Sequence, residues 1–288
     1  MGNKKHKMKQ ISILGCGWLG LPLAKALLVK GFSVKGSTTT EGKLPVLKAI
    51  GIDPFLISLS AVEGGLDSKS STSAIDNFLN ASKILVINIP PQLRGKSYDS
   101  SIANKKIFVE KIKTLIPYIE KSMIENVLFV SSTSVYGETD TMITEETIPT
   151  PDTESGKQLL EAEQLLQNNP NFKTTILRFG GLIGDDRNPT RFLAGKQNLE
   201  NPETPINFIH QEDCIGIILK IIATDSWSEI YNGVSPFHPT RATYYTQKAN
   251  ELGLPLPQFD HSKPSNGKLV LSEKVENFLG YAFIKNNL

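Results

Sequence analysis

The stretch "QISILGCGWLGLPLAKALLVK", residues 10–30, decides the fold of the first part of the chain. A short apolar run opens it, and three glycines follow with the spacing G-x-G-x-x-G, at Gly15, Gly17 and Gly20. Residues 19–30 then read as a helix. The order of strand, glycine-rich turn and helix is typical of the first βαβ unit of an open parallel sheet.

The three glycines have separate steric roles in such a turn. Gly15 permits the tight turn, Gly17 lets the backbone approach a pyrophosphate, and Gly20 lets the helix pack against the strand. Amide groups at the start of the helix, helped by its dipole, would hold the phosphates. We therefore expect a bound dinucleotide at Gly15, Gly17, Trp18, Leu19 and Gly20. A plain strand–helix turn is the alternative.

Apolar strand-like runs alternate with helix-like stretches through the first two thirds of the chain. The strand-like runs are 10–15, 32–38, 54–59, 83–90, 126–132 and 173–179, and the clearest helix-like stretches are 19–30, 43–51, 104–121 and 156–167. After about residue 180 the pattern loosens, with one further helix-like run at 213–224. Strands rich in Val, Ile and Leu that alternate with helices predict a doubly wound α/β fold with a parallel sheet. We expect a dinucleotide-binding Rossmann domain over 9–180 and a small substrate lobe, partly interleaved with it, over 181–288.

The segment after the second strand-like run, "KGSTTTEGK" (35–43), bears on the choice of cofactor. An NAD-preferring fold places Asp or Glu near Thr38 to hold the ribose 2′-hydroxyl, but no carboxylate precedes Glu41. Thr38 and Thr39 tolerate a 2′-phosphate, and Lys35 or Lys43 could pair with one. The sequence favours NADP over NAD, and a turn that is neutral between them stays open.

The bulk composition excludes several classes of function. The chain has 288 residues, 39% hydrophobic, and a net charge of +2, which are ordinary values for a soluble globular protein and indicate no nucleic-acid partner. No apolar run approaches the length of about 18 residues needed to span a bilayer. The Lys-rich start reads as a frayed tail. The two cysteines form no disulfide framework, and no metal site is expected, so a cytoplasmic location is the default.

A cluster of hydroxyl groups ends the fifth strand-like run, "NVLFVSSTSVYG" (126–137). Here the chain resembles the extended short-chain dehydrogenases/reductases, the nucleotide-sugar epimerase/dehydratase group, whose corresponding segment reads Ser-Ser-x-x-Val-Tyr-Gly. Three later segments resemble that family in the same order: "ITEETIPTP" (143–151), "ILRFGGLIGDDRNP" (176–189) and "NFIHQEDCIGII" (207–218). The resemblance extends from Gln10 to about Tyr281.

The resemblance implies a small-molecule substrate, with Ser132 orienting its reactive oxygen, and a cofactor that Ser131, Ile89 and Pro90 also contact. It leaves open a homodimer formed through helices of the sheet domain. Two departures from the family's usual motifs, described below, make the chain similar to a subset of the family described as atypical. That subset shares the segments "INIPP" (87–91) and "HPTRATYY" (238–245). The glycine motif is also shorter than the family's usual G-x-x-G-x-x-G.

The family's catalytic Tyr-x-x-x-Lys pair is absent. Ser155 and Leu159 stand in its two positions. Lys157 lies two residues after Ser155, so it points to another side of the helix. We expect Leu159 to be packing and Ser155 to be the N-cap of the helix.

Other groups could carry a proton in place of the missing pair. Tyr136 is the best placed in sequence, so Ser132 and Tyr136 are the predicted catalytic residues. His210 is expected to be structural, with Asp213 capping the helix that follows. Arg94, Lys96 and Tyr98 lie on an expected lid.

The sequence supports three functional hypotheses. An NAD(P)-dependent oxidoreductase or epimerase-like enzyme ranks first, and a non-catalytic protein that senses the redox state of NADP(H) ranks second. A hydroxyacid-type dehydrogenase ranks last, because the Pro- and Asn-rich last third shows little of that group's helical C-terminal domain.

Overall fold

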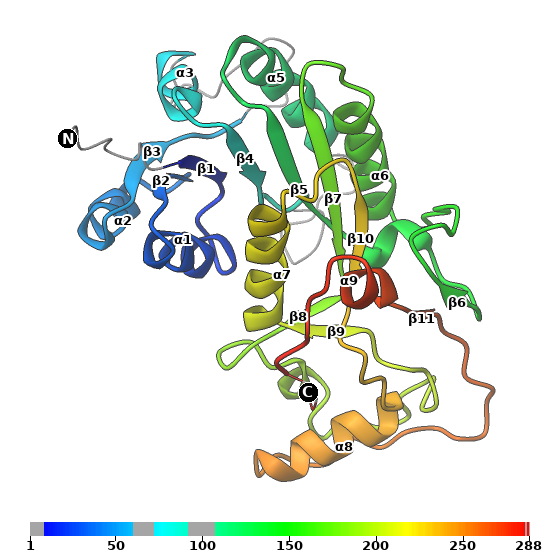
Figure 1. Cartoon of the computed structure of the whole chain (residues 1–288). Helices are drawn as coiled ribbons and strands as arrows, with labels where there is room; N and C mark the ends of the chain where they lie inside the picture. Colours follow the sequence, from blue (N-terminus) through cyan, green and yellow to red (C-terminus); the bar gives the residue numbers. More distant parts are fainter. Residues whose placement is uncertain (1–8, 60–71, 92–106, 286, 288) are drawn as a thin grey trace. The chain divides into compact units, whose positions relative to one another are not determined.

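A seven-stranded sheet forms the framework of the protein (Figure 1). The computed structural model describes residues 9–59, 72–91, 107–285 and 287. The strand order is β10-β7-β5-β4-β1-β2-β3. These strands are β1 (Gln10–Leu14), β2 (Ser33–Thr38), β3 (Asp53–Leu56), β4 (Ile84–Ile87), β5 (Asn126–Ser132), β7 (Lys173–Phe179) and β10 (Ile230–Gly233). The pairs β1–β2, β2–β3, β1–β4 and β4–β5 are parallel, so the predicted doubly wound sheet is confirmed.

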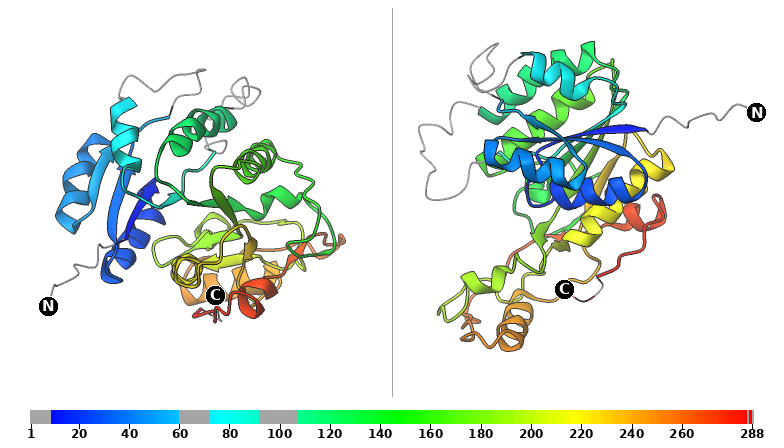
Figure 2. Two further views of the ribbon diagram at one scale, coloured as in Figure 1. Left: turned by 45° about the horizontal axis from the view of Figure 1, so that its top comes forward. Right: turned by 90° about the vertical axis from the view of Figure 1, so that its left-hand side faces the viewer.

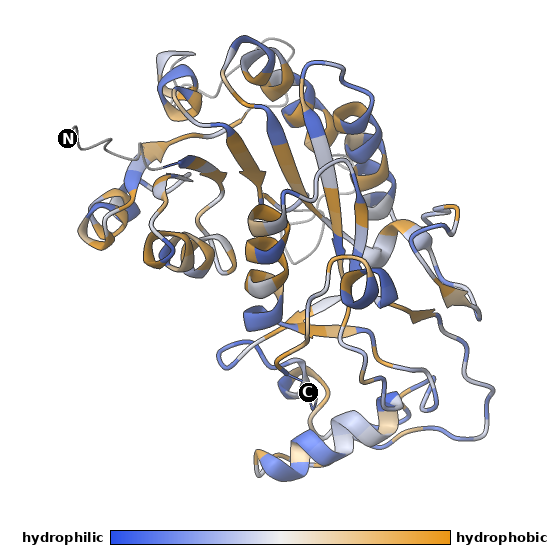
Figure 3. Ribbon diagram, in the orientation of Figure 1, coloured by the Kyte–Doolittle hydropathy of each residue, from blue (hydrophilic) through white to orange (hydrophobic). Residues whose placement is uncertain are grey.

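The strand order reverses between β1 and β4. From β1 the chain proceeds outward to β2 and β3, and it then returns to the other side of β1 to form β4. Helices that leave the two neighbouring strands in opposite directions open a crevice at the strands' carboxyl ends. The middle residues of these two strands are buried, with Ile11, Ile13 and Val86 at 0% exposure, which is why both strands read as apolar runs (Figure 3).

Helices cover both faces of this part of the sheet. The helices α1 (Gly20–Val29) and α2 (Leu44–Ile50) lie on one face, and α3 (Thr72–Leu79) and α5 (Ile107–Lys121) lie on the other (Figure 2). The sequence predicted α1, α2 and α5 to within a few residues but did not predict α3. Within the described parts of the chain, no helix is both long and apolar enough to cross a membrane.

The chain forms two compact units. One comprises the described residues up to Ser131 together with Lys157–Leu177 and Asp225–Glu229, and the other comprises Ser132–Gly156, Arg178–Thr224 and the residues from Ile230 on. Both units thus draw on segments from either side of residue 180. The division into domains over 9–180 and 181–288 remains a prediction.

The second unit contains short elements around an aromatic cluster. Its helices are α7 (Gln211–Thr224), α8 (Arg241–Glu251) and α9 (Glu273–Asn277), and its two small parallel sheets pair β6 (Met142–Ile143) with β11 (Leu269–Val270) and β8 (Gly181–Ile183) with β9 (Phe208–His210). Tyr244 and Tyr245 pack edge-to-face, 5.3 Å between ring centroids, and both contact the Phe208 ring. These two tyrosines are therefore core residues of this unit.

The start of helix α6 (Glu154–Gln167) corrects one prediction and confirms another. Thr153, not Ser155, is the N-cap, because its Oγ1 accepts the backbone N–H of Gly156 at 3.1 Å. Ser155 lies inside the first turn, since the helix begins two residues earlier than its apolar pattern indicates. Leu159 is 4% exposed, so its predicted packing role is confirmed.

The start of α7 corrects the prediction that Asp213 is a cap. His210 has that role: its Nδ1 accepts the backbone N–H of Glu212 at 3.2 Å, a structural use of the histidine as predicted. Asp213 is completely buried and instead accepts hydrogen bonds from the Tyr281 hydroxyl and from the backbone of Ile284 and Lys285. A carboxylate that turns away from its own helix to bind a distant segment cannot be recognised from local spacing.

Candidate functional site

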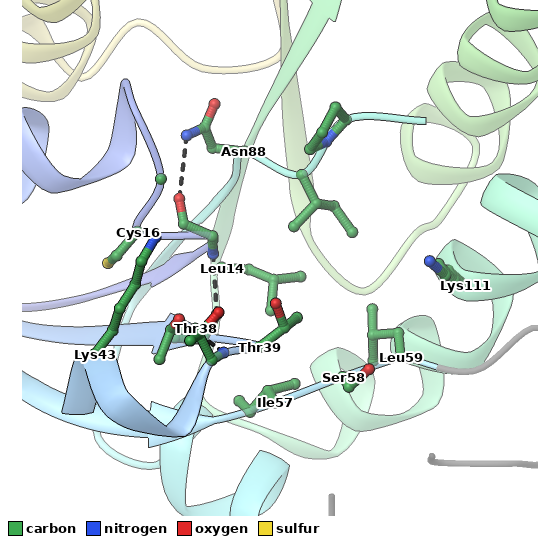
Figure 4. Close-up of a pocket in the computed structure, with 16 residues that line it drawn as sticks. Leu14, Cys16, Thr38, Thr39, Lys43, Ile57, Ser58, Leu59, Asn88 and Lys111 are labelled. Atoms are coloured by element: carbon green, nitrogen blue, oxygen red, sulfur yellow. Dashed lines mark hydrogen bonds between the residues drawn. The ribbon is translucent and has the colours of Figure 1, made fainter. Parts of the chain in front are cut away.

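A pocket of about 350 Å³ lies in the first unit where β1 to β4 end (Figure 4). Four strand-end segments and helix α5 line it. The lining residues are Leu14–Gly17 after β1, Ser37–Thr40 and Lys43 after β2, Ile57–Leu59 after β3, Asn88–Pro90 after β4, and Lys111 of α5. The pocket occupies the crevice expected at the reversal of strand order.

The three glycines of the turn have different surroundings. Gly15 has a φ of +102°, and a Cβ there would lie 2.6 Å from the carbonyl oxygen of Asn88. A Cβ on Gly20 would lie 2.2 Å from the carbonyl oxygen of Gly15. Backbone atoms of the protein itself therefore leave no room for a side chain at Gly15 or Gly20. Gly17 has no atom within 4 Å of its Cβ position. That open space beside the pocket is what the approach of a phosphate group requires.

Hydrogen bonds from two neighbouring strands fix the backbone of the glycine turn. The Gly15 N–H donates to Ser37 Oγ at 2.9 Å, and the Cys16 N–H donates to the Ser37 carbonyl at 2.8 Å. On the other side, Asn88 Nδ2 donates to the Gly15 carbonyl at 3.2 Å.

The side chain of Cys16 is buried, and this burial raises the pKa of its thiol to about 12. A hydrogen bond with the Ser37 backbone opposes the rise by a smaller amount. This thiol is therefore protonated at neutral pH and unsuited to act as a nucleophile.

The end of β2 presents hydroxyl groups and a cation to the pocket. Thr38 is buried and its Oγ1 accepts the Thr40 N–H at 3.1 Å, whereas Thr39 and Lys43 are exposed. No lining residue of this pocket in the described chain carries a carboxylate. Lys35 points elsewhere, because its Nζ donates to backbone carbonyls at the end of α3. Of the two lysines that the sequence offered, only Lys43 lines the pocket.

Six of the ten predicted cofactor-binding residues line this pocket: Gly15, Gly17, Thr38, Thr39, Ile89 and Pro90. The roles of the other four, Trp18, Leu19, Gly20 and Ser131, remain predictions. Sequence reasoning missed Asn88, Ile57–Leu59 and Lys111. Asn88 and Ile57–Leu59 could have been predicted, because they directly follow β4 and β3 and ligands bind at the carboxyl ends of such strands. Lys111 gave no signal, since it lies in the middle of an amphipathic helix.

The two strand-end serines have different partners. Ser131 is buried, and its hydroxyl donates to Oε1 of the fully buried Glu163 at 2.5 Å within the first unit. Ser132 is half-buried, and its Oγ accepts the backbone N–H of Ser134 at 3.2 Å. A hydroxyl that accepts a bond in this way still has its hydrogen to donate.

The hydroxyl of Tyr136 is held inside the second unit. It donates to Asn232 Oδ1 at 2.8 Å and accepts from Arg178 Nη1 at 2.9 Å, and the side chain is 1% exposed. Burial raises the pKa of Tyr136, and the nearby Arg178 guanidinium opposes that rise. A proton-accepting phenol needs a lowered pKa, so these contacts give Tyr136 a structural role. Catalysis by its hydroxyl remains a prediction.

The expected lid residues Arg94, Lys96 and Tyr98 lie outside the described residues, as do residues 1–8 of the Lys-rich start. Across the described ranges, no cluster of three or more His, Cys, Asp or Glu side chains is arranged to hold a metal ion.

Comparisons with known proteins identify relatives of the whole chain. No protein-family model matches it. The chain is 35% identical over 277 residues to the protein YeeZ of Escherichia coli K12, which covers 96% of each chain.

Solved structures show the same fold at lower identity. A short-chain dehydrogenase/reductase superfamily protein of Agrobacterium tumefaciens with bound NAD is 18% identical, with a TM-score of 0.74 over 94% of this chain and 91% of the other. The UDP-glucuronic acid 4-epimerase of Bacillus cereus in complex with NAD is 15% identical, with a TM-score of 0.77 over 95% and 91% of the two chains. The resemblance predicted from the motifs is therefore confirmed at the level of the fold.

Proposed function

Since the chain belongs to the family of the Escherichia coli protein YeeZ and has the short-chain dehydrogenase/reductase fold, we propose that it binds a nicotinamide dinucleotide in the pocket of its first unit and acts as an oxidoreductase or epimerase/dehydratase-like enzyme. The observation that carries this proposal is the glycine turn, in which Gly15 and Gly20 are closed by internal contacts while Gly17 faces open space.

The residues of the pocket suit the parts of a dinucleotide. Helix α1 begins directly after the turn, and the open position of Gly17 admits a pyrophosphate to the Gly17 amide and to the Gly20 N–H at the helix start. The next positions of the helix offer no further group, because the Leu21 N–H donates to the Gly17 carbonyl at 3.0 Å and Pro22 has no N–H. The apolar side chains of Ile57 and Leu59 suit the adenine ring, and Thr38 and Thr39 suit the ribose. When bound, the dinucleotide supplies the hydride-transfer chemistry.

NADP is the preferred cofactor in this proposal. The lining after β2 has hydroxyl groups and Lys43 but no carboxylate to repel a 2′-phosphate. The ammonium group of Lys43 would attract that phosphate as a point charge. We expect Lys43→Ala to weaken NADPH binding several-fold and to leave NADH binding nearly unchanged.

On the substrate side, Ser132 donates its hydroxyl hydrogen to a carbonyl or hydroxyl oxygen. Nucleotide sugars are the first substrate class to test, because the Bacillus cereus relative in fold is named for a UDP-sugar. The two positions of the usual catalytic pair hold Ser155 and the buried Leu159, so a non-standard group or a bound water supplies or accepts the proton.

Two measurements test the proposal in sequence. Titration of the protein with NADPH and NADH, followed by cofactor fluorescence and calorimetry, should show binding that Gly17→Ala weakens. Incubation with the bound cofactor and a panel of nucleotide sugars, aldehydes and quinones should then show turnover that Ser132→Ala abolishes. A protein that binds neither dinucleotide would refute the whole proposal.

A non-catalytic sensor of NADP(H) is the second candidate. The buried Leu159 and the raised pKa of Tyr136 favour it, because both positions lack a group ready to exchange a proton. A sensor must bind NADP⁺ and NADPH with different affinities, since only differential binding shifts a conformational equilibrium. Equal affinities in calorimetry would exclude this candidate, and turnover would favour the first.

A further inference from the structure

The side chain of Asn88 reaches from the end of β4 to the glycine turn after β1 (Figure 4). Its Nδ2 donates to the carbonyl oxygen of Gly15 at 3.2 Å, and its backbone N–H donates to the carbonyl of Leu14 at 2.9 Å. The two segments are 73 residues apart in sequence. Side chain and backbone of one residue thus bind two consecutive carbonyls, that of the last residue of β1 and that of the first glycine of the turn.

Two glycines of the turn make room for Asn88, Gly15 for its backbone and Gly20 for its side chain. A Cβ on Gly15 would lie 2.6 Å from the Asn88 carbonyl oxygen, and a Cβ on Gly20 would lie 3.0 Å from Asn88 Nδ2. Because neither Gly15 nor Gly20 has a side chain, Asn88 can pack directly against the turn and the first residue of α1. Asn88 is half-buried there and also lines the pocket.

The contact fixes one particular peptide group. Between Gly15 and Cys16, the carbonyl oxygen accepts from Asn88, and the N–H donates to the Ser37 carbonyl at 2.8 Å. The ends of β4 and β2 therefore hold this peptide plane from both sides. Only the φ and ψ angles of Cys16 separate this plane from the next amide, that of Gly17. A turn fixed before the ligand arrives loses less conformational entropy on binding.

We propose that Asn88 is a positioning residue of the dinucleotide site, which holds the Gly15 carbonyl and so orients the phosphate-binding amides; this inference rests on the proposed function. The amide is suited to the task because it donates a hydrogen bond without carrying charge. An ionised carboxylate of the same shape only accepts, so it would repel the Gly15 carbonyl and a phosphate alike.

Asn88→Asp and Asn88→Ala test the role, with Asn126→Asp as the matched control, because Asn126 is a half-buried asparagine that begins the neighbouring strand β5. We expect N88A to weaken NADPH binding about tenfold, the size of effect that one lost hydrogen bond produces. We expect N88D to weaken it further at neutral pH, and N126D to bind as the unaltered protein does.

The pH profile separates positioning from a general structural effect. The affinity of N88D for NADPH should recover as the pH falls and the introduced carboxyl becomes protonated, because a protonated carboxyl can donate the lost bond. The unaltered protein and N126D should show no such recovery. If N88D does not fold, the NADPH affinity of N88A compared with that of the unaltered protein tests the role.

The outcomes are distinguishable. If the unaltered protein binds neither NADPH nor NADH, the proposed function fails. If it binds one of them and N88A binds equally tightly, or if N88D loses affinity without any recovery at low pH, the positioning role of Asn88 is refuted and the proposed function stands.

Discussion

Gly17 and Gly20 belong to one motif but meet different surroundings. A Cβ on Gly20 would lie 2.2 Å from the Gly15 carbonyl, whereas one on Gly17 would meet nothing within 4 Å. We expect Gly20→Ala to lower the free energy of unfolding by about 1–3 kcal/mol through overpacking. Gly17→Ala should leave stability nearly unchanged and weaken NADPH binding at least tenfold.

Urea denaturation and cofactor titration of both variants check this pair. The two single-methyl changes act as controls for each other. A Gly17→Ala protein that binds NADPH normally, or a Gly20→Ala protein as stable as the unaltered one, would contradict the assignment of open and closed positions in the turn.

His238 makes the stability of the second unit depend on pH. Burial lowers its pKa from the ordinary value of 6.5, and a hydrogen bond with the Ile206 carbonyl, 2.9 Å from Nδ1, opposes this only in part. The folded state disfavours the protonated ring, so this contribution to stability is complete above pH 6.5 and is lost as the pH falls through the lowered pKa.

We therefore expect the free energy of unfolding to fall between pH 7 and pH 5, with a shallower slope in His238→Asn. An amide at this position can still donate to the Ile206 carbonyl but does not titrate. Urea denaturation of both proteins across that range measures the two slopes, and parallel slopes would argue against the role of His238.

Helix α6 is an element whose first turn is fixed by one hydroxyl. The Thr153 side chain accepts the Gly156 N–H at 3.1 Å, while Ser155 is inside the helix. Loss of an N-cap costs about 1 kcal/mol, so Thr153→Ala should lower the free energy of unfolding by that amount. Ser155→Ala should change it by less than about 0.5 kcal/mol. Equal effects of the two changes in chemical denaturation would contradict the cap.

The elements that the sequence predicted are those with a strong local signal. Strands buried on both faces are rich in apolar residues, which identified β1, β5 and β7 to within one residue and the position of β4. Helix α8, "RATYYTQKANE", is largely polar and its apolar side is mainly two tyrosines, so it was not predicted as a helix. Strand β10 has four residues and gave no pattern long enough to recognise.

At the scale of the whole molecule, a bound dinucleotide should stabilise the folded chain by mass action. At a concentration 100 times the Kd, the expected gain is about 2.7 kcal/mol. NADPH should raise the melting temperature more than NADH at equal concentration, because Lys43 lines the pocket and no lining side chain of the described chain is acidic. Differential scanning fluorimetry measures both shifts. Equal shifts would argue against NADP preference, and Lys43→Ala should make them equal.

The sequence by itself determined six of the seven strands of the large sheet and their order along the chain, the glycine turn and the family resemblance. These follow from properties that each segment carries alone, namely apolar periodicity and the conformations that only glycine permits. Only the tertiary structure decided that Lys43 and not Lys35 faces the pocket, that Asp213 binds the C-terminal segment, and that Asn88 lies against Gly15. Each of these depends on which face of an element turns inward and on a partner far away in the chain. Spacing within one segment does not encode that information.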